Sequence, residues 1–139
     1  MPEITGQVHH VNLSVRDLDL SADWYVRLFN LTDMLRIDDP SGAWSKRILR
    51  HSSGFLLGLT QHAASDGGAF REERCGLDHV AFDVGDRANL DAWLDQLDRD
   101  GIEHSPVKTT PLGTLITLRD PDNVQLELYS ATLPASPGA

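Results

Sequence analysis

The composition describes one domain-sized chain with an acidic surface. Its 139 residues, 40% of them hydrophobic, are enough to bury a core. Twenty-one acidic against twelve basic residues give a formal net charge of −9, which repels nucleic-acid phosphates and anionic lipid, so we expect neither as a partner. No apolar run approaches the roughly 20 residues that a membrane span needs, and Met1-Pro2-Glu3 does not begin a signal peptide. We therefore expect a cytoplasmic protein.

The first predicted element is a strand within residues 7–15. Val11, Leu13 and Val15 alternate with polar residues, which is the period of a strand with one buried face. Because successive side chains of a strand point to opposite faces, His10 is expected on the face away from the core. The second copy of this pattern, residues 76–84, places His79 in the same way.

The segments that follow each strand are also similar. A helix is predicted within residues 22–29, after N-cap candidates in residues 17–21, and a second helix within residues 89–97, ending at Asp100-Gly101. Three β-like segments follow each helix. In the first half these are about Met34 to Asp38, Trp44 to His51 and Phe55 to Gln61; in the second they are about Glu103 to Thr109, Thr114 to Arg119 and Val124 to Ser130.

One offset of 69 residues relates the two halves without a gap. It aligns His10 with His79, and it also aligns Trp24 with Trp93 and Leu59 with Leu128. The sequence therefore predicts an α+β fold of two βαβββ modules, residues 7–62 and 76–131, within a single domain spanning 1–139. A flexible linker of residues 63–75 joins them, and residues 132–139 form a loose tail. The modules are expected to pair into an eight-stranded curved sheet with helices outside and a cleft inside.

Three stretches carry a resemblance to a known family. They are His10-Val11-X-Leu13-X-Val15-X-Asp17-Leu18, its echo His79-Val80-Ala81-Phe82-Asp83-Val84, and Arg119-Asp120-Pro121-Asp122-Asn123-Val124-Gln125-Leu126-Glu127. The chain resembles, over nearly its whole length, the vicinal oxygen chelate superfamily of glyoxalases, extradiol dioxygenases, fosfomycin-inactivating thiol transferases and bleomycin-binding resistance proteins. Such a resemblance indicates the fold more than the reaction.

Glu127 completes a candidate metal site with His10 and His79. Leu126 and Leu128 match core leucines of the first module, so Glu127 should face away from the core, as both histidines do. A carboxylate on a partly dry face needs a charge partner, which a cation would supply. Two imidazoles and one carboxylate are a known ligand set for Fe²⁺ and Mn²⁺, which we favour, with Zn²⁺, Ni²⁺ and Co²⁺ as alternatives. A register slip of one residue would exchange His10 with His9.

Other candidate site residues are less well defined by the sequence. Gly58 stands where glyoxalases of this superfamily typically place a fourth ligand, and the acid/base residues of the extradiol enzymes are missing from the matching region. The basic residues that are candidates for binding a phosphonate are scattered along the sequence: Lys46, Arg47 and Lys108. Tyr129 is a candidate catalytic hydroxyl, with Asn12, Asp83, Thr117 and Arg119 as candidate substrate-binding residues; His51, His62 and His104 are expected to be solvated.

Three functions remain open at this point. The first is a divalent-metal enzyme acting on a small substrate that chelates the metal through adjacent oxygens, with dioxygenase-like cleavage favoured, as an oxidoreductase or lyase. The second is a metal-dependent transferase or isomerase, such as an antibiotic-modifying thiol transferase. The third is a metal-free small-molecule-binding resistance protein. In each case we expect a homodimer. For the two metal-dependent functions, the metal site lies either within one chain or is shared between two.

Overall fold

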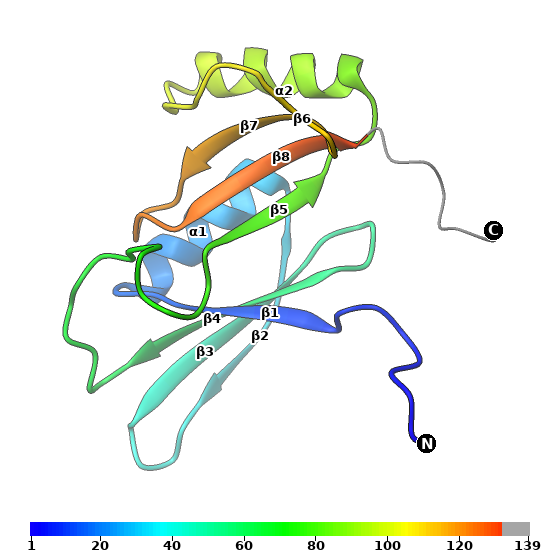
Figure 1. Cartoon of the computed structure of the whole chain (residues 1–139). Coiled ribbons are helices and arrows are strands. Elements are labelled where there is room, and N and C mark those ends of the chain that lie inside the picture. The colour runs from blue at the N-terminus through cyan, green and yellow to red at the C-terminus, as the bar shows by residue number, and fades with distance from the viewer. Residues whose placement is uncertain (132–139) are drawn as a thin grey trace. The chain divides into compact units, whose positions relative to one another are not determined.

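The computed structural model describes residues 1–131, so the predicted tail of residues 132–139 lies outside the described part of the chain. Two compact units are present, Met1–Ala69 and Phe70–Ala139. Each unit holds one four-stranded sheet and one long helix (Figure 1). The predicted α+β fold of two βαβββ modules is confirmed.

The first unit follows the predicted element order. Its sheet has the strand order β1-β4-β3-β2, with β1 parallel to β4 and the other pairs antiparallel. The helix α1 packs against β3 and β4. The elements are β1 (His10–Ser14), α1 (Leu18–Phe29), β2 (Thr32–Asp38), β3 (Trp44–Arg50) and β4 (Leu56–His62).

The second unit repeats this arrangement. Its sheet has the order β5-β8-β7-β6, again with the first and last strands of the unit parallel. The helix α2 packs against β8. The elements are β5 (His79–Asp83), α2 (Arg87–Arg99), β6 (Lys108–Thr110), β7 (Gly113–Arg119) and β8 (Gln125–Ala131).

The offset of 69 residues holds at the level of strand register. His10 lies opposite Leu56 in the first sheet, and His79 lies opposite Gln125 in the second. The bounds of β1, β3 and β4 map onto those of β5, β7 and β8 under the same offset. Equivalent positions of the two modules therefore occupy equivalent places in their own sheets.

Both helices have an aspartate as N-cap, and that of the first helix is among the N-cap candidates of residues 17–21. The side chain of Asp17 accepts a hydrogen bond from the backbone N–H of Leu20, and Asp86 accepts one from Asn89. At the end of α2, Gly101 has φ +67°, and the N–H of Ile102 bonds to the carbonyl of Leu97. This is the left-handed C-terminal cap that the glycine predicted.

The strand predicted over residues 103–109 is mostly absent. Only Lys108–Thr110 forms a strand, together with an isolated bridge between His104 and Leu118. Pro106 has no N–H to donate, and the backbone N–H of Thr117 bonds to the hydroxyl of Ser105 instead of to a carbonyl. The ladder is thus interrupted between the bridge and β6.

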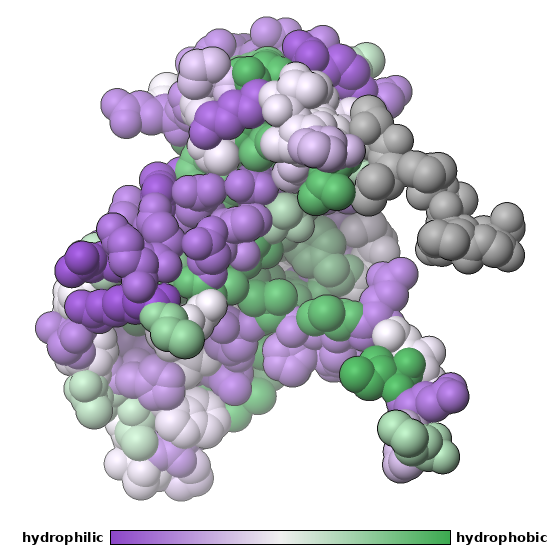
Figure 2. All heavy atoms as spheres, viewed as in Figure 1, coloured by the Kyte–Doolittle hydropathy of each residue, from purple (hydrophilic) through white to green (hydrophobic). Residues whose placement is uncertain are grey.

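Hydrophilic residues predominate on the face of the molecule that Figure 2 shows, with hydrophobic residues in smaller groups. Within residues 1–131, no helix has both the length and the apolar character needed to cross a bilayer.

Candidate functional site

Alternation along β8 separates the core from the candidate site. Leu126 and Leu128 are fully buried, and Glu127 lies between them on the opposite face of the sheet. Glu127 pairs with Ala81 of β5, and His79 precedes Ala81 by two residues, so His79 and Glu127 share a face. The second unit therefore brings together two of the three predicted metal ligands.

His79 is oriented between two carboxylates. Its Nδ1 lies 2.7 Å from Oδ1 of Asp78, and its Nε2 lies 3.4 Å from Oε2 of Glu127. A neutral imidazole that donates Nδ1–H to Asp78 presents the lone pair of Nε2 to Glu127. Two electron pairs then face each other, an arrangement that needs a proton or a cation between them. A carboxylate on the outer nitrogen is also the usual support of a metal-bound histidine.

The Glu127 carboxylate is nearly dry. Its side chain is 11% exposed, and Oε1 accepts a hydrogen bond of 3.2 Å from the Gln125 amide. The Gln125 carbonyl accepts from Arg119 at 3.1 Å, and Arg119 in turn binds Glu72 at 2.8 Å. These contacts fix one face of the carboxylate and leave Oε2 directed at His79. No arginine binds Glu127 directly among the described residues.

The pair of Glu72 and Arg119 makes stability depend on pH. Hydrogen bonding to Arg119 lowers the pKa of Glu72 from 4.5 to about 2. A lowered folded-state pKa stabilises the fold above 4.5, and this contribution declines as the pH falls from 4.5 toward 2. We expect Glu72→Gln to lower the urea midpoint at neutral pH and the difference from wild type to vanish in strong acid. Glu73→Gln, on a neighbouring exposed carboxylate, is the control and should show no such trend in circular dichroism.

His10 has the same kind of support in the first unit. Its Nδ1 lies 2.9 Å from Nδ1 of His9, which the offset of 69 relates to Asp78. The residue before each of the two predicted histidine ligands thus contacts Nδ1 and leaves Nε2 available. His9 supports His10 in this arrangement, and strand β1 begins at His10.

At one paired position, the first unit has a large side chain on its first strand and none on its last, the reverse of the second unit. Asn12 and Gly58 occupy the positions that correspond to Ala81 and Glu127. Asn12 pairs with Gly58, and a Cβ on Gly58 would lie 2.5 Å from the Asn12 amide nitrogen. The Asn12 side chain therefore covers the position that a fourth ligand would occupy, and its Oδ1 accepts a 2.7 Å hydrogen bond from Thr60. In the second unit the small residue is on β5 and the large one on β8.

The remaining predicted residues divide by their contacts. Tyr129 shares the face of Glu127, and its hydroxyl lies 2.7 Å from that of Thr110. Thr117 lies opposite Glu127 on β7. The carboxylate of Asp83 accepts from the backbone of Gly85. The Arg119 guanidinium donates hydrogen bonds to Glu72, so a substrate would have to compete with Glu72 for it.

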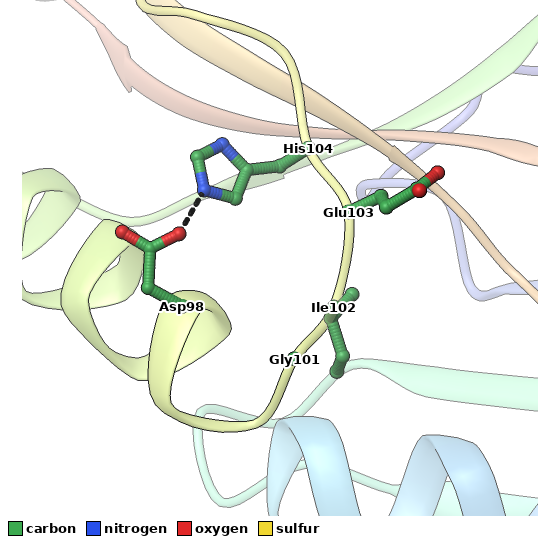
Figure 3. A pocket seen from close by; sticks show the side chains of 5 residues that line it. All are labelled: Asp98, Gly101, Ile102, Glu103 and His104. Atoms are coloured by element: carbon green, nitrogen blue, oxygen red, sulfur yellow. Dashed lines mark hydrogen bonds and ion pairs between the residues drawn. The ribbon is translucent and has the colours of Figure 1, made fainter.

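His104 is bound at both ring nitrogens rather than solvated. Nδ1 donates to the carbonyl of Ser105 at 2.7 Å, and Nε2 faces Asp98 at 2.8 Å. Figure 3 shows the ring directed at Asp98, at the end of α2, beside an open depression of about 540 Å³. The Ser105 carbonyl, and then Asp98, raise the pKa of His104. This histidine ties the helix to the loop that precedes β6.

His10 belongs to the first unit, whereas His79 and Glu127 belong to the second. Among residues 1–131, the structure does not gather three or more His, Cys, Asp or Glu residues into a metal site. The complete set of three ligands therefore stays a prediction. The sequence signal that could have found the supporting residues was the alignment of position 9 with position 78.

A sequence profile of the Glyoxalase/Bleomycin resistance protein/Dioxygenase superfamily matches residues 7–128. The chain belongs to this superfamily. The match includes His10, His79 and Glu127, and it spans both units. The superfamily resemblance inferred from the sequence is thus confirmed.

Similar proteins agree with this assignment. The protein YwkD of Bacillus subtilis is 30% identical over 124 residues, which cover 88% of this chain and 94% of YwkD. A glyoxylase/bleomycin resistance protein/dioxygenase domain from Frankia has a TM-score of 0.81 at 29% identity, covering 93% of this chain and 99% of its own. The fosfomycin resistance protein FosX of Listeria monocytogenes shares the fold, with a TM-score of 0.73 at 22% identity, covering 94% and 97%.

Proposed function

We propose that the protein is a divalent-metal-dependent enzyme whose metal is held by His10, His79 and Glu127. The observation that carries the proposal is the nearly buried Glu127 carboxylate, which faces Nε2 of His79 while Asp78 occupies Nδ1. This donor set suits Fe²⁺ or Mn²⁺. Structures of FosX contain Mn(II), one with a dihydroxypropylphosphonic acid, which supports a divalent ion on this fold.

The substrate in this proposal is a small molecule with two adjacent oxygens. A bound divalent ion would supply Lewis-acid polarisation of those oxygens. The chain's own residues would hold the substrate around them. The amide nitrogen of Asn12 is an available donor because its oxygen is taken by Thr60, and the Thr117 hydroxyl is available opposite Glu127. The Tyr129 hydroxyl, fixed by Thr110, would orient the substrate.

Dioxygenase-like cleavage is the reaction to test first. Metal analysis of the purified protein, followed by oxygen consumption with catechols after Fe²⁺ loading, should give one metal-dependent activity that Glu127→Ala abolishes. Oxygen consumption at the rate of free Fe²⁺ would reject the dioxygenase and leave a Lewis-acid transferase or isomerase. Absence of metal binding by the wild-type protein under Fe²⁺ and Mn²⁺ would reject the proposal as a whole.

A further inference from the structure

One face of the first sheet combines hydrocarbon side chains with positive charge. Leu49, Leu57 and Leu59 are fully or almost fully buried on the side of α1. Alternation then places the other set of β3 residues on the opposite face, which β1 shares through His10. That set on β3 consists of Trp44, Lys46, Ile48 and Arg50.

Strand β2 extends the hydrocarbon part of this face. Leu35 lies opposite Ile48, and Ile37 lies opposite Lys46. Leu35 is 48% exposed and Ile37 is 43% exposed, although both are large apolar side chains. A row of residues thus crosses the sheet from Asn12 through Gly58 and Ile48 to Leu35. We call the face formed by Leu35, Ile37, Trp44, Lys46 and Ile48 the β2–β3 face.

The cations of strands β2 and β3 differ in whether a carboxylate neutralises them. Arg36 pairs with Asp38, and Arg47 binds Asp19 at 2.9 Å. Among the described residues, neither Lys46 nor Arg50 forms an ion pair with a carboxylate. Nζ of Lys46 instead lies 5.2 Å from the centre of the Trp44 ring.

Unneutralised positive charge is notable in a chain of net charge −9. Lys46 and Arg50 lie on the same face as Leu35 and Ile37, so the face is complementary to a molecule that is both anionic and apolar. A purely polar anion would leave the apolar side chains in water, and a purely apolar ligand would leave the ammonium unpaired. The combination selects for a ligand with one charge and a hydrocarbon body.

We propose that the β2–β3 face recognises a small organic carboxylate with an aromatic or hydrocarbon body, and that this is the substrate class of the enzyme. The inference rests on the proposed function in one respect: the molecule bound at the β2–β3 face is taken to be the one that also reaches the metal at His10. Strand β3 is two strand spacings from β1, or roughly 10 Å in the hydrogen-bonding direction. Lys46 is in register with Thr60 and Ser14, on the same face of the sheet as His10. Lys46 would bind the carboxylate, and Leu35 and Ile37 would cover the body.

A matched pair of probes tests this substrate class. We would titrate 4-phenylbutyrate and its neutral amide into the metal-free full chain and follow the indole resonance of Trp44, assigned with Trp44→Phe. The carboxylate is expected to bind about tenfold more tightly than the amide, because a charge-assisted contact is lost in the amide. Lys46→Met should abolish this preference without changing the affinity for the amide.

Control variants separate charge from general effects. Arg27→Met removes one positive charge from an exposed position of α1 in the same unit and should keep the preference. Leu35→Gln, at an exposed position, should weaken both probes alike. Equal binding of the two probes by wild type, or a preference that persists in Lys46→Met, would overturn the inference.

A separate Mn²⁺ titration distinguishes this inference from the proposed function. Lys46→Met should bind Mn²⁺ as wild type does, since Lys46 is not a predicted ligand. Wild-type protein that binds the carboxylate but no Mn²⁺ would overturn the metal-dependent enzyme and leave the carboxylate site standing. Wild-type protein that binds Mn²⁺ but does not prefer the carboxylate over the amide would overturn the carboxylate site and leave the metal-dependent enzyme standing.

Discussion

Replacing Glu127 with alanine is expected to weaken Mn²⁺ or Fe²⁺ binding by more than about a hundredfold. Loss of a supporting residue alone commonly costs 10- to 100-fold, and Glu127 is the one anionic donor of the predicted set. Titration of free Mn²⁺ by electron paramagnetic resonance measures the change directly. Asp78→Asn, which alters only the support of His79, should cost about tenfold to a hundredfold.

The stability of the same variant gives a second readout. Glu127 is nearly buried, and no lysine or arginine pairs with it within residues 1–131, so the metal-free variant should unfold at the same urea concentration as wild type or higher. Mn²⁺ at about 100 times the wild-type Kd should stabilise wild type by about 2.7 kcal/mol and the variant by no more than about 0.4 kcal/mol. Glu103→Ala removes an exposed carboxylate of the same unit and serves as the control.

A mixing experiment separates a metal site within one chain from a site shared in the predicted homodimer. His10→Ala and Glu127→Ala each break every site when purified alone. If His10 of one chain joins Glu127 of another, a mixed dimer regains one intact site, and Mn²⁺ binding returns in part. If each site lies within one chain, mixing restores nothing. Unimpaired Mn²⁺ binding by Glu127→Ala alone would contradict the ligand assignment.

The repeat explains why so much of each unit could be predicted from the sequence. Alternation within one strand assigns a side chain to a face, so His79 and Glu127 could be placed together before their distance was known. The same logic fails across sheets, because alternation carries no information on how one sheet faces another. For that reason the sequence could not show whether His10 shares a site with His79 and Glu127.

Other features of the second unit and of the helices were not predicted correctly from the sequence. Pro106 within residues 103–109 was a signal that the strand would break. Trp24 and Trp93, which the offset of 69 residues aligns, are only half-buried, whereas Tyr25 and Leu97 are fully buried. A large ring is rarely enclosed completely by a single helix face, so smaller neighbours fill the core. The support of Glu127 by Gln125 was missed because polar residues at strand ends are common.

The hairpin that joins β6 to β7 contains the backbone position with the least room. Gly113 has φ +141°, and a Cβ there would lie 2.2 Å from the backbone oxygen of Ser130 and 2.9 Å from Cα of Ala131. Its counterpart in the first unit is Trp44, which follows a longer loop. The close approach therefore comes from the short connection Pro111–Leu112, in which Thr110 hydrogen-bonds both Leu112 and Gly113.

Gly113→Ala is expected to destabilise the fold by about 3 kcal/mol or more, because both the backbone conformation and the contact with β8 must change. Gly85→Ala is the matched control: Gly85 has φ +84° but open space around it, so strain alone should cost about 1 kcal/mol. Urea unfolding followed by circular dichroism measures both. Since β8 carries Glu127, the surviving Gly113→Ala protein should also bind Mn²⁺ more weakly than Gly85→Ala does. Equal effects of the two substitutions would contradict the close packing of β7 against β8.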